Sequence, residues 1–229
     1  MPRLTSTGAC SFCGGVFGKR AMVTHLQKCQ KRQAQQQASG GKSKPTTLYH
    51  LLVEGRHLPE YWMHIELPAS EILGHLDQFL RNTWLECCGH LSAFEIAGQR
   101  YSVAPMDEFG FEDLHEENMD FTLGEVLRPG MTFEHEYDFG TTTELKLKVV
   151  SMREGQIKKG KRAQILARNN PPPIPCSECE QPATNVCSQC IYDDAGWLCD
   201  EHSATHECGE DYLLPVVNSP RVGMCGYVG

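Results

Sequence analysis

The twelve cysteines and ten histidines of this 229-residue chain carry its most recognisable chemistry, because thiolates and imidazoles are the usual ligands of protein-bound zinc. Near the amino terminus, the spacing C-x2-C-x11-H-x3-C is a four-ligand pattern of the CCHC kind. A CxxC turn presents two thiolates to one ion, and residues at i and i+4 of a helix share one face. We therefore predict a zinc site whose ligands are Cys10, Cys13, His25 and Cys29.

This finger should span residues 1–33, with a small core of Phe12, Phe17, Met22 and Leu26. So short a segment cannot bury enough apolar surface to fold alone, whereas zinc supplies roughly 10–16 kcal/mol. Residues 34–46 are rich in Gln, Ser, Gly and Lys, which predicts a flexible linker. We expect loss of a finger ligand to unfold the finger alone.

A second array of ligand pairs lies between residues 176 and 208, after the prolines at 171–173. Four ligands fill one tetrahedral site, so eight ligands can hold two ions. With the finger, the sequence predicts three zinc ions in total. The eight residues are Cys176, Cys179, Cys187, Cys190, Cys199, His202, His206 and Cys208.

The order of these pairs resembles B-box and MYND-type modules, which interleave their ligand pairs. The resemblance implies two sites, one of Cys176, Cys179, Cys199 and His202, and one of Cys187, Cys190, His206 and Cys208. The spacing of the last pair is tighter than in those families, so Cys225 is the alternative final ligand. Such modules bind proteins more often than nucleic acid, and a purely structural lid is the alternative.

Charge is distributed unevenly along the chain. Residues 1–45 hold eight Lys or Arg and no acidic residue, while residues 168–229 hold two basic and nine acidic residues. A basic head suits a polyanion, either DNA or RNA. Contact with a protein, or a solvated basic helix without a ligand, are the alternatives. The predicted nucleic-acid contacts on or beside the finger helix are Lys19, Arg20, Lys28, Lys31 and Arg32.

The middle block, residues 47–170, predicts an α+β fold in which a helix covers one face of a sheet. Alternation predicts paired strands at 48–54 and 61–67, with His64 and Glu66 facing solvent. Ser70 is expected to cap a helix that runs to Trp84, and a short helix is expected at 122–127. Further strands are expected at 91–96, 99–103, 132–139, 145–152 and 163–168.

Several phrases of the middle block resemble the plasmid Ri ORF-three-like family. They are LPEYW at 58–62, IELP at 65–68, GHLSAFEIAG at 89–98 and YDFG at 137–140. The resemblance covers residues 47–168 and implies an α+β fold and an association with plasmids and mobile elements. The family usually continues YDFG with an acid, a Trp and a His, whereas this chain has TTTEL at 141–145.

The middle block offers no recognisable catalytic constellation, since GxSxG, P-loop and dinucleotide motifs do not occur in the sequence. His135 alternates with apolar residues, which indicates a packed histidine, and Asp138 is expected to be a turn residue. Cys87 and Cys88 are adjacent and are expected to be core or loop thiols that neither bridge each other nor share a metal. We therefore predict a non-catalytic, zinc-binding adaptor; an enzyme with its site around YDFG is the alternative.

The CxxC spacing of the cysteines favours metal binding in a reducing compartment over secreted disulfides. The first residues lack an apolar signal region, and apolar runs stay shorter than the ~18–20 residues of a spanning helix. The expected location is the cytoplasm.

Overall fold

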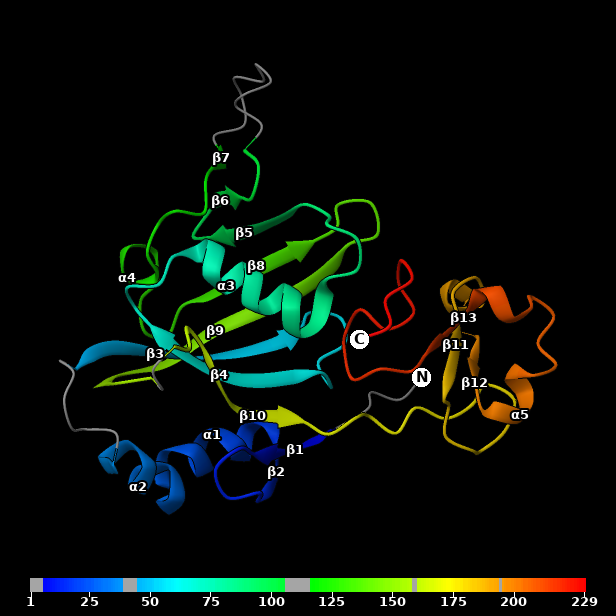
Figure 1. Ribbon diagram of the computed structural model, residues 1–229, viewed down its shortest axis with the longest axis horizontal. Helices are drawn as coiled ribbons and strands as arrows, with labels where there is room; N and C mark the ends of the chain where they lie inside the picture. Colours follow the sequence, from blue (N-terminus) through cyan, green and yellow to red (C-terminus); the bar gives the residue numbers. More distant parts are fainter. Residues whose placement is uncertain (1–5, 39–44, 106–115, 158–159, 194) are drawn as a thin grey trace.

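A ten-stranded sheet organises the computed structural model (Figure 1), which describes residues 6–38, 45–105, 116–157, 160–193 and 195–229. The strand order is β2-β1-β10-β4-β3-β9-β8-β5-β6-β7, and every neighbouring pair is antiparallel except β6 and β7. Its central strands are β3 (Thr46–Gly55), β4 (Trp62–Pro68), β8 (Thr132–Tyr137) and β9 (Thr143–Gly155). The outer strands are β5 (Ser92–Ile96), β6 (Gln99–Ser102), β7 (Glu116–Glu117) and β10 (Gln164–Asn169).

One face of the sheet packs against helices, which confirms the predicted α+β class. Helix α3 (Leu73–Leu80) continues into a π-helical turn at Arg81–Leu85, and Trp84 is fully buried there. The alternating residues of β4 that were expected to face this core do so, with Met63 and Ile65 fully buried. The short helix α4 (Leu123–Val126) begins at a capping box formed by Thr122 and Glu125.

The start of α3 differs from the prediction. Ile72, not Ser70, is the N-cap residue, and it makes no side-chain capping bond. Ile72 instead forms a β-bridge with Thr122, and the Leu73 N–H donates to the carbonyl of Phe121. Backbone pairing with the segment before α4 therefore satisfies part of the helix start in place of a capping side chain.

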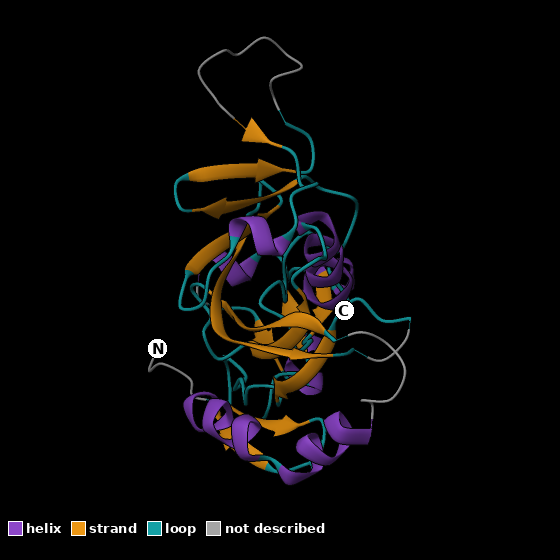
Figure 2. Cartoon of the chain, turned by 90° about the vertical axis from the view of Figure 1, so that its left-hand side faces the viewer, coloured by secondary structure: helices purple, strands orange, loops and turns teal. Residues whose placement is uncertain are grey.

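The amino-terminal finger extends the sheet and covers part of its other face. It comprises β1 (Thr7–Cys10), β2 (Val16–Gly18), α1 (Lys19–Lys28) and α2 (Gln30–Ala38), and β1 pairs with β10. A Cβ at Gly8 would collide with the Arg168 carbonyl and the Trp62 ring, so this approach requires glycine. Met22 and Leu26 pack with Trp62 in a second core, and Figure 2 shows both finger helices beside the sheet edge.

Two predictions fail because the finger covers this face. His64 and Glu66 are buried, not exposed to solvent. Glu66 accepts hydrogen bonds from Arg32 of α2 and from Arg153 of β9.

The expected linker is helical up to Ala38, and its residues 39–44 lie outside the described part of the chain.

The C-terminal module is built on a three-stranded sheet in the order β12-β11-β13. Its elements are β11 (Asn185–Cys187), β12 (Trp197–Leu198), α5 (Asp200–Ser203) and β13 (Leu213–Pro215), with 3-10 turns at Cys190–Asp193 and Glu210–Tyr212. The chain then returns to the central domain, where Val222 joins the main core and the Ser219 hydroxyl donates to the Trp84 carbonyl. Among the described residues, no helix is long and apolar enough to cross a membrane.

Candidate metal centres

The four finger ligands predicted from the sequence converge into a first cluster, with all ligand atoms within 4.8 Å of one another. Cys10 and Cys13 flank the β1–β2 turn, while His25 lies on α1 and Cys29 directly follows it. The Cys13 Sγ lies 3.3 Å from the His25 Nε2 and accepts a hydrogen bond from the Gly15 N–H. Two thiols are buried, so the cluster can hold a metal ion away from bulk water.

A second cluster combines Cys176, Cys179, Cys199 and His202, the set implied by the B-box and MYND resemblance. The His202 Nδ1 lies 3.4 Å from the Cys176 Sγ and 3.3 Å from the Cys199 Sγ. Burial raises the pKa of Cys176, but backbone N–H groups, first that of Glu178, outweigh burial and lower it to about 6. A thiolate that exists near neutral pH is ready to bind a cation.

The third cluster joins Cys187, Cys190, His206 and Cys208. The Cys190 Sγ lies 3.6 Å from the Cys208 Sγ and 3.5 Å from the His206 Nε2. Hydrogen bonds with Cys208 and then Cys187 raise the pKa of Cys190 to about 12, because they favour its protonated form. Cys208 thus completes this cluster, and the alternative final ligand, Cys225, lies elsewhere.

Cys87 and Cys88 lie in a loop, as expected, but the expectation that they cannot share a metal-binding group is wrong. Together with His90 and Cys225 they form a fourth cluster, with all four ligand atoms within 4.8 Å. The Cys87 and Cys88 Sγ atoms are 3.6 Å apart, and the Cys88 and Cys225 Sγ atoms are 3.7 Å apart. The sequence could not reveal this arrangement, because the tail residue is more than 130 positions from its partners.

The five basic residues that the sequence predicted as nucleic-acid contacts differ in their solvent exposure. Arg20, Lys28 and Lys31 are exposed, and Lys19 is half-buried and pairs with Glu54. Arg32 is buried and bonded to the Leu26 carbonyl and to Glu66, so it is a structural residue and not a phosphate contact.

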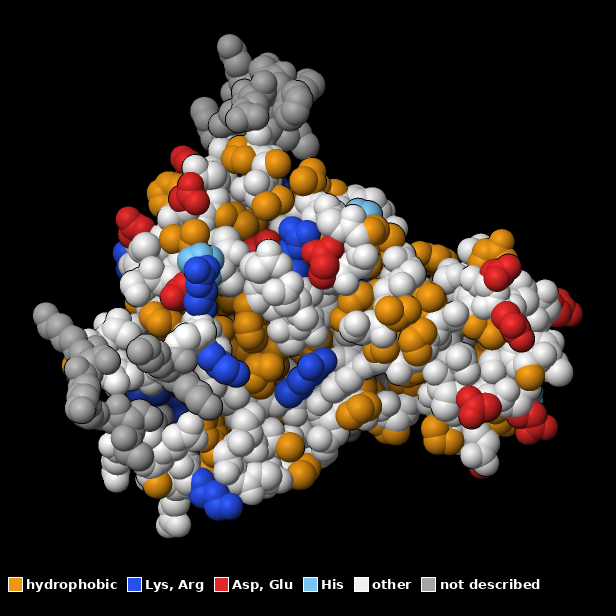
Figure 3. Space-filling view, viewed as in Figure 1, with side chains coloured by type: hydrophobic (Ala, Val, Ile, Leu, Met, Phe, Trp, Pro, Cys, Tyr) orange, Lys and Arg blue, Asp and Glu red, His pale blue; other side chains and the backbone are white. Residues whose placement is uncertain are grey.

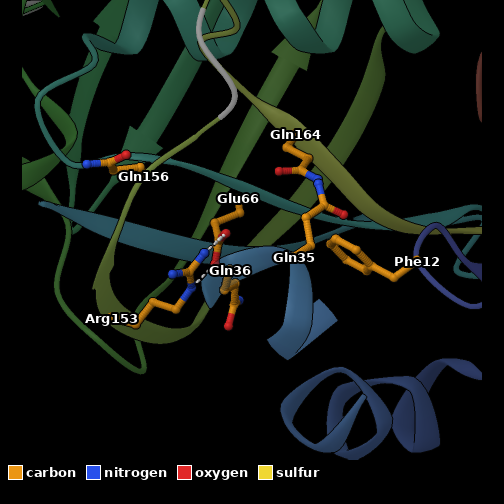
Figure 4. A pocket seen from close by; sticks show the side chains of 7 residues that line it. All are labelled: Phe12, Gln35, Gln36, Glu66, Arg153, Gln156 and Gln164. Carbon is orange, nitrogen blue, oxygen red and sulfur yellow. Dashed lines mark hydrogen bonds and ion pairs between the residues drawn. The ribbon is translucent and has the colours of Figure 1, made fainter. Parts of the chain in front are cut away.

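A groove of about 580 Å³ lies between α1 and the sheet. Arg20 lines it from α1, while Lys146 and Lys148, which the sequence analysis missed, line it from β9. Both lysines are exposed, because alternate residues of β9 point away from the core. A smaller cavity of about 220 Å³ nearby is shown in Figure 4, where Glu66 points toward Arg153 beside Gln35 and Gln36 of α2.

Acidic side chains gather on the C-terminal module at one end of the molecule (Figure 3). In Figure 3, acidic side chains stud the C-terminal module, while the visible Lys and Arg side chains lie over the rest of the protein. Among the described residues of this module, eight acidic ones are exposed: Glu178, Glu180, Asp193, Asp200, Glu201, Glu207, Glu210 and Asp211.

The YDFG segment forms a tight turn built around Asp138, whose φ of 65° is left-handed. Its carboxylate accepts bonds from the N–H groups of Gly140 and Thr141 and from the buried Arg221 guanidinium. Burial raises the pKa of Asp138, but these hydrogen bonds, first that of Arg221, lower it below its usual value. His135 is fully buried and lies 2.7 Å from Asp77, as expected for a packed histidine.

The central domain matches a family model described as plasmid pRiA4b ORF-3-like protein over residues 50–180, more than half of the chain. The chain belongs to this family. The matched residues run from β3 to the first ligand pair of the C-terminal module, so the finger and most of that module lie outside the region that defines pRiA4b ORF-3-like proteins.

A crystal structure of a protein of unknown function from Methanosarcina mazei is similar to this pRiA4b ORF-3-like protein, with a TM-score of 0.41 and 17% sequence identity. The similarity covers 55% of this chain and 68% of that chain. No curated protein matched the chain.

Proposed function

We propose that this pRiA4b ORF-3-like protein is a zinc-stabilised, non-catalytic adaptor that contacts nucleic-acid phosphates through the groove between α1 and the sheet. The observation that carries the proposal is the convergence of Arg20, Lys146 and Lys148 in that groove. Two other cations of the groove, Lys19 and Arg56, are already paired with glutamates. The three remaining cations form no ion pair with another described residue, so they are available to displace counterions from a polyanion.

Zinc is the ion that best suits the clusters. Each of the first three clusters offers three thiols and one imidazole, a combination common in structural zinc sites. Soft thiolate ligands disfavour Mg²⁺ and Ca²⁺, which prefer oxygen. Four protein ligands leave no position for water or substrate, so these sites support structure and not hydrolysis.

The C-terminal module is the proposed contact for a protein partner. Its eight exposed acidic side chains would repel a nucleic acid. The same charges complement a basic protein surface, where they would speed association more than they would tighten the complex.

Neutralising the groove tests the nucleic-acid contact. Lys146→Gln together with Lys148→Gln should weaken binding to a labelled duplex DNA or single-stranded RNA by about tenfold at moderate salt. The slope of log affinity against log salt should fall by about 1 to 2, because each lost phosphate contact removes about 0.7–0.9. Fluorescence anisotropy at several salt concentrations measures both quantities.

The matched control is Lys161→Gln with Arg162→Gln, the same change of charge at exposed residues that line a depression beside α3. This control should leave both the affinity and the salt slope unchanged. Equal weakening by the two double variants would show that net charge, and not the groove, governs binding.

The alternative of an enzyme around YDFG is tested by Asp138→Asn. The adaptor proposal expects a lower thermal midpoint, because the buried Arg221 loses its charged partner, while nucleic-acid affinity measured below that midpoint stays unchanged. Normal thermal stability with loss of a measured turnover would make Asp138 catalytic.

A further inference from the structure

The fourth cluster has the same donor set as the other three. Cys87, Cys88 and Cys225 supply three thiols and His90 one imidazole. Each of the first three clusters combines two ligand pairs whose members are two to four positions apart in the sequence. The fourth is assembled from a loop before β5 and from the tail. Without a metal, such a group of side chains would serve no structural purpose, and its exposed thiols would be open to oxidation.

The sulfur–sulfur distances agree with tetrahedral coordination. Zn–S bonds of about 2.3 Å and Zn–N bonds of about 2.0–2.1 Å place ligand atoms roughly 3.5–3.8 Å apart. In the fourth cluster, the Cys88 Sγ lies 3.6 Å from the Cys87 Sγ and 3.7 Å from the Cys225 Sγ. The His90 Nε2 lies closer to the sulfurs, at 3.2 Å from the Cys225 Sγ and 2.9 Å from the Cys88 Sγ. The third cluster shows similar separations of 3.6 and 3.5 Å.

The ligand-bearing loop is held in place by the Tyr137 hydroxyl. This hydroxyl accepts hydrogen bonds from the backbone N–H groups of Cys87 and His90 and donates to Glu86. Glu86 in turn accepts a bond from the Gly89 N–H. The loop geometry that points Cys87, Cys88 and His90 at one another is therefore fixed by protein contacts.

The tail segment is fixed just as firmly, by Arg221. This fully buried guanidinium donates to the Asp138 carboxylate, the Thr141 carbonyl and the Thr143 hydroxyl. It also donates to the Cys87 Sγ at 3.4 Å. Three thiolates around a divalent cation leave one negative charge, and a guanidinium in contact with a sulfur offsets it, as outer hydrogen bonds do at metal sites.

The backbone at Cys225 gives an independent indication. Its φ is 47°, in the left-handed region that favours glycine, and the residue is exposed. A side chain held in this conformation at the surface costs energy without contributing to a core. The conformation directs the Cys225 sulfur to within 3.7 Å of Cys88, which a ligand role explains.

We propose that Cys87, Cys88, His90 and Cys225 bind a fourth zinc ion, which ties the C-terminal tail to the loop before β5. The chain then holds four zinc ions instead of the three predicted from its sequence. None of these four ligands is buried, whereas each of the other clusters has at least one buried thiol. The fourth ion is therefore the first to be lost to a chelator.

Elemental analysis of the full chain, purified with reductant and without chelator, tests the proposal. The wild-type protein should contain four zinc ions, and Cys225→Gly should contain three. Glycine suits the left-handed backbone at this position, so the variant should fold normally by circular dichroism. Cys225→His offers a replacement ligand and should restore the fourth ion. Cys88→Ser removes a different ligand and should also contain three ions. It provides the test if Cys225→Gly fails to fold.

Chelation kinetics with a chromogenic zinc chelator provide a second measurement. Wild-type protein should release one equivalent of zinc in an early phase that is missing from Cys225→Gly. With Co²⁺ in place of zinc, the thiolate-to-metal absorption should fall by about a quarter in the same variant. Three zinc ions in both wild-type and Cys225→Gly protein would overturn the proposal. A Cys88–Cys225 disulfide in protein holding only three ions would do the same.

Discussion

At the scale of single residues, the most unusual pair is His50 and His64, whose rings share a 2.9 Å hydrogen bond beneath the finger. Burial, followed by repulsion from His64 and Arg32, lowers the pKa of His50 to about 3. Burial also lowers the pKa of His64 to about 4. Both imidazoles are consequently neutral in the folded chain at physiological pH.

This pair predicts a loss of stability in mild acid. In the unfolded chain each imidazole binds a proton near its ordinary pKa of about 6.5, so below that pH the unfolded state holds more protons. The free energy of unfolding is therefore fully retained above about pH 6.5 and falls as the pH drops toward 4 and then 3, by up to ~1.4 kcal/mol per pH unit for each imidazole. Urea unfolding between pH 7.5 and 5 measures the loss.

The matched comparison is His50→Gln, which keeps a hydrogen-bonding side chain and removes one titrating group. Acid also weakens zinc binding, but it does so in both proteins, so their difference reports the histidine. The stability of the wild-type protein should fall more steeply with decreasing pH than that of the variant. Parallel curves would mean that the imidazoles titrate alike in the folded and unfolded states.

At the scale of elements, alternation along β4 predicted which side chains face α3, and Met63 and Ile65 are buried there. The same alternation placed His64 and Glu66 on the opposite face, but it carries no information about what covers that face. The finger covers it, through β1 pairing and the packing of α1 on Trp62. Local periodicity therefore specified the strands, while contacts between distant segments decided burial.

The first three clusters could be predicted from the sequence because their ligands are closely spaced in it. The fourth could not be predicted, since the tail that carries Cys225 is held to the central domain by long-range contacts, among them those of Ser219 and Arg221. Lys146 and Lys148 were missed for a related reason. On a strand, two exposed lysines indicate only a solvated face, and they acquire meaning when α1 lies opposite them.

The contact between the finger and the sheet predicts that its charged residues contribute unequally to the free energy of unfolding. Glu66 is almost fully buried between Arg32 and Arg153. Glu66→Gln leaves two guanidinium groups beside a neutral amide and should cost about 3–5 kcal/mol. Arg153→Gln, at a partly exposed residue, should cost less, because Glu66 keeps its bond to Arg32. Chemical denaturation compares the two variants, and equal losses would contradict the assignment of Glu66 as the shared partner.

At the scale of the whole molecule, the two metal-binding ends are continuous with the central domain. β1 pairs with β10, and Val186 and Val222 belong to the same core as α3. We therefore no longer expect the loss of a finger ligand to unfold the finger alone. Removal of the first ion should also loosen the edge of the central sheet at β10.

Calorimetry tests this continuity. Cys13→Ser should lower the midpoint of the main thermal transition, instead of abolishing a separate small one, because the finger shares hydrogen bonds and apolar contacts with the sheet. Hydrogen exchange should show faster exchange at Leu166 and Ala167, which pack in the finger core. An unchanged main transition, with exchange altered only in residues 6–38, would show that the finger is energetically separate.

The return of the tail to the central domain has a consequence for synthesis on the ribosome. Arg221 donates to Asp138, Thr141 and Thr143, which are translated more than 70 positions earlier, so these bonds form only after Arg221 has emerged. β1 pairs with β2 inside the finger, but its other edge gains its partner β10 only much later in synthesis. The finger can capture its metal long before either event, whereas the fourth cluster gains its last sulfur only when Cys225 has emerged. Metal loading thus follows the order of the ligands along the growing chain, and the fourth ion is bound after the first three.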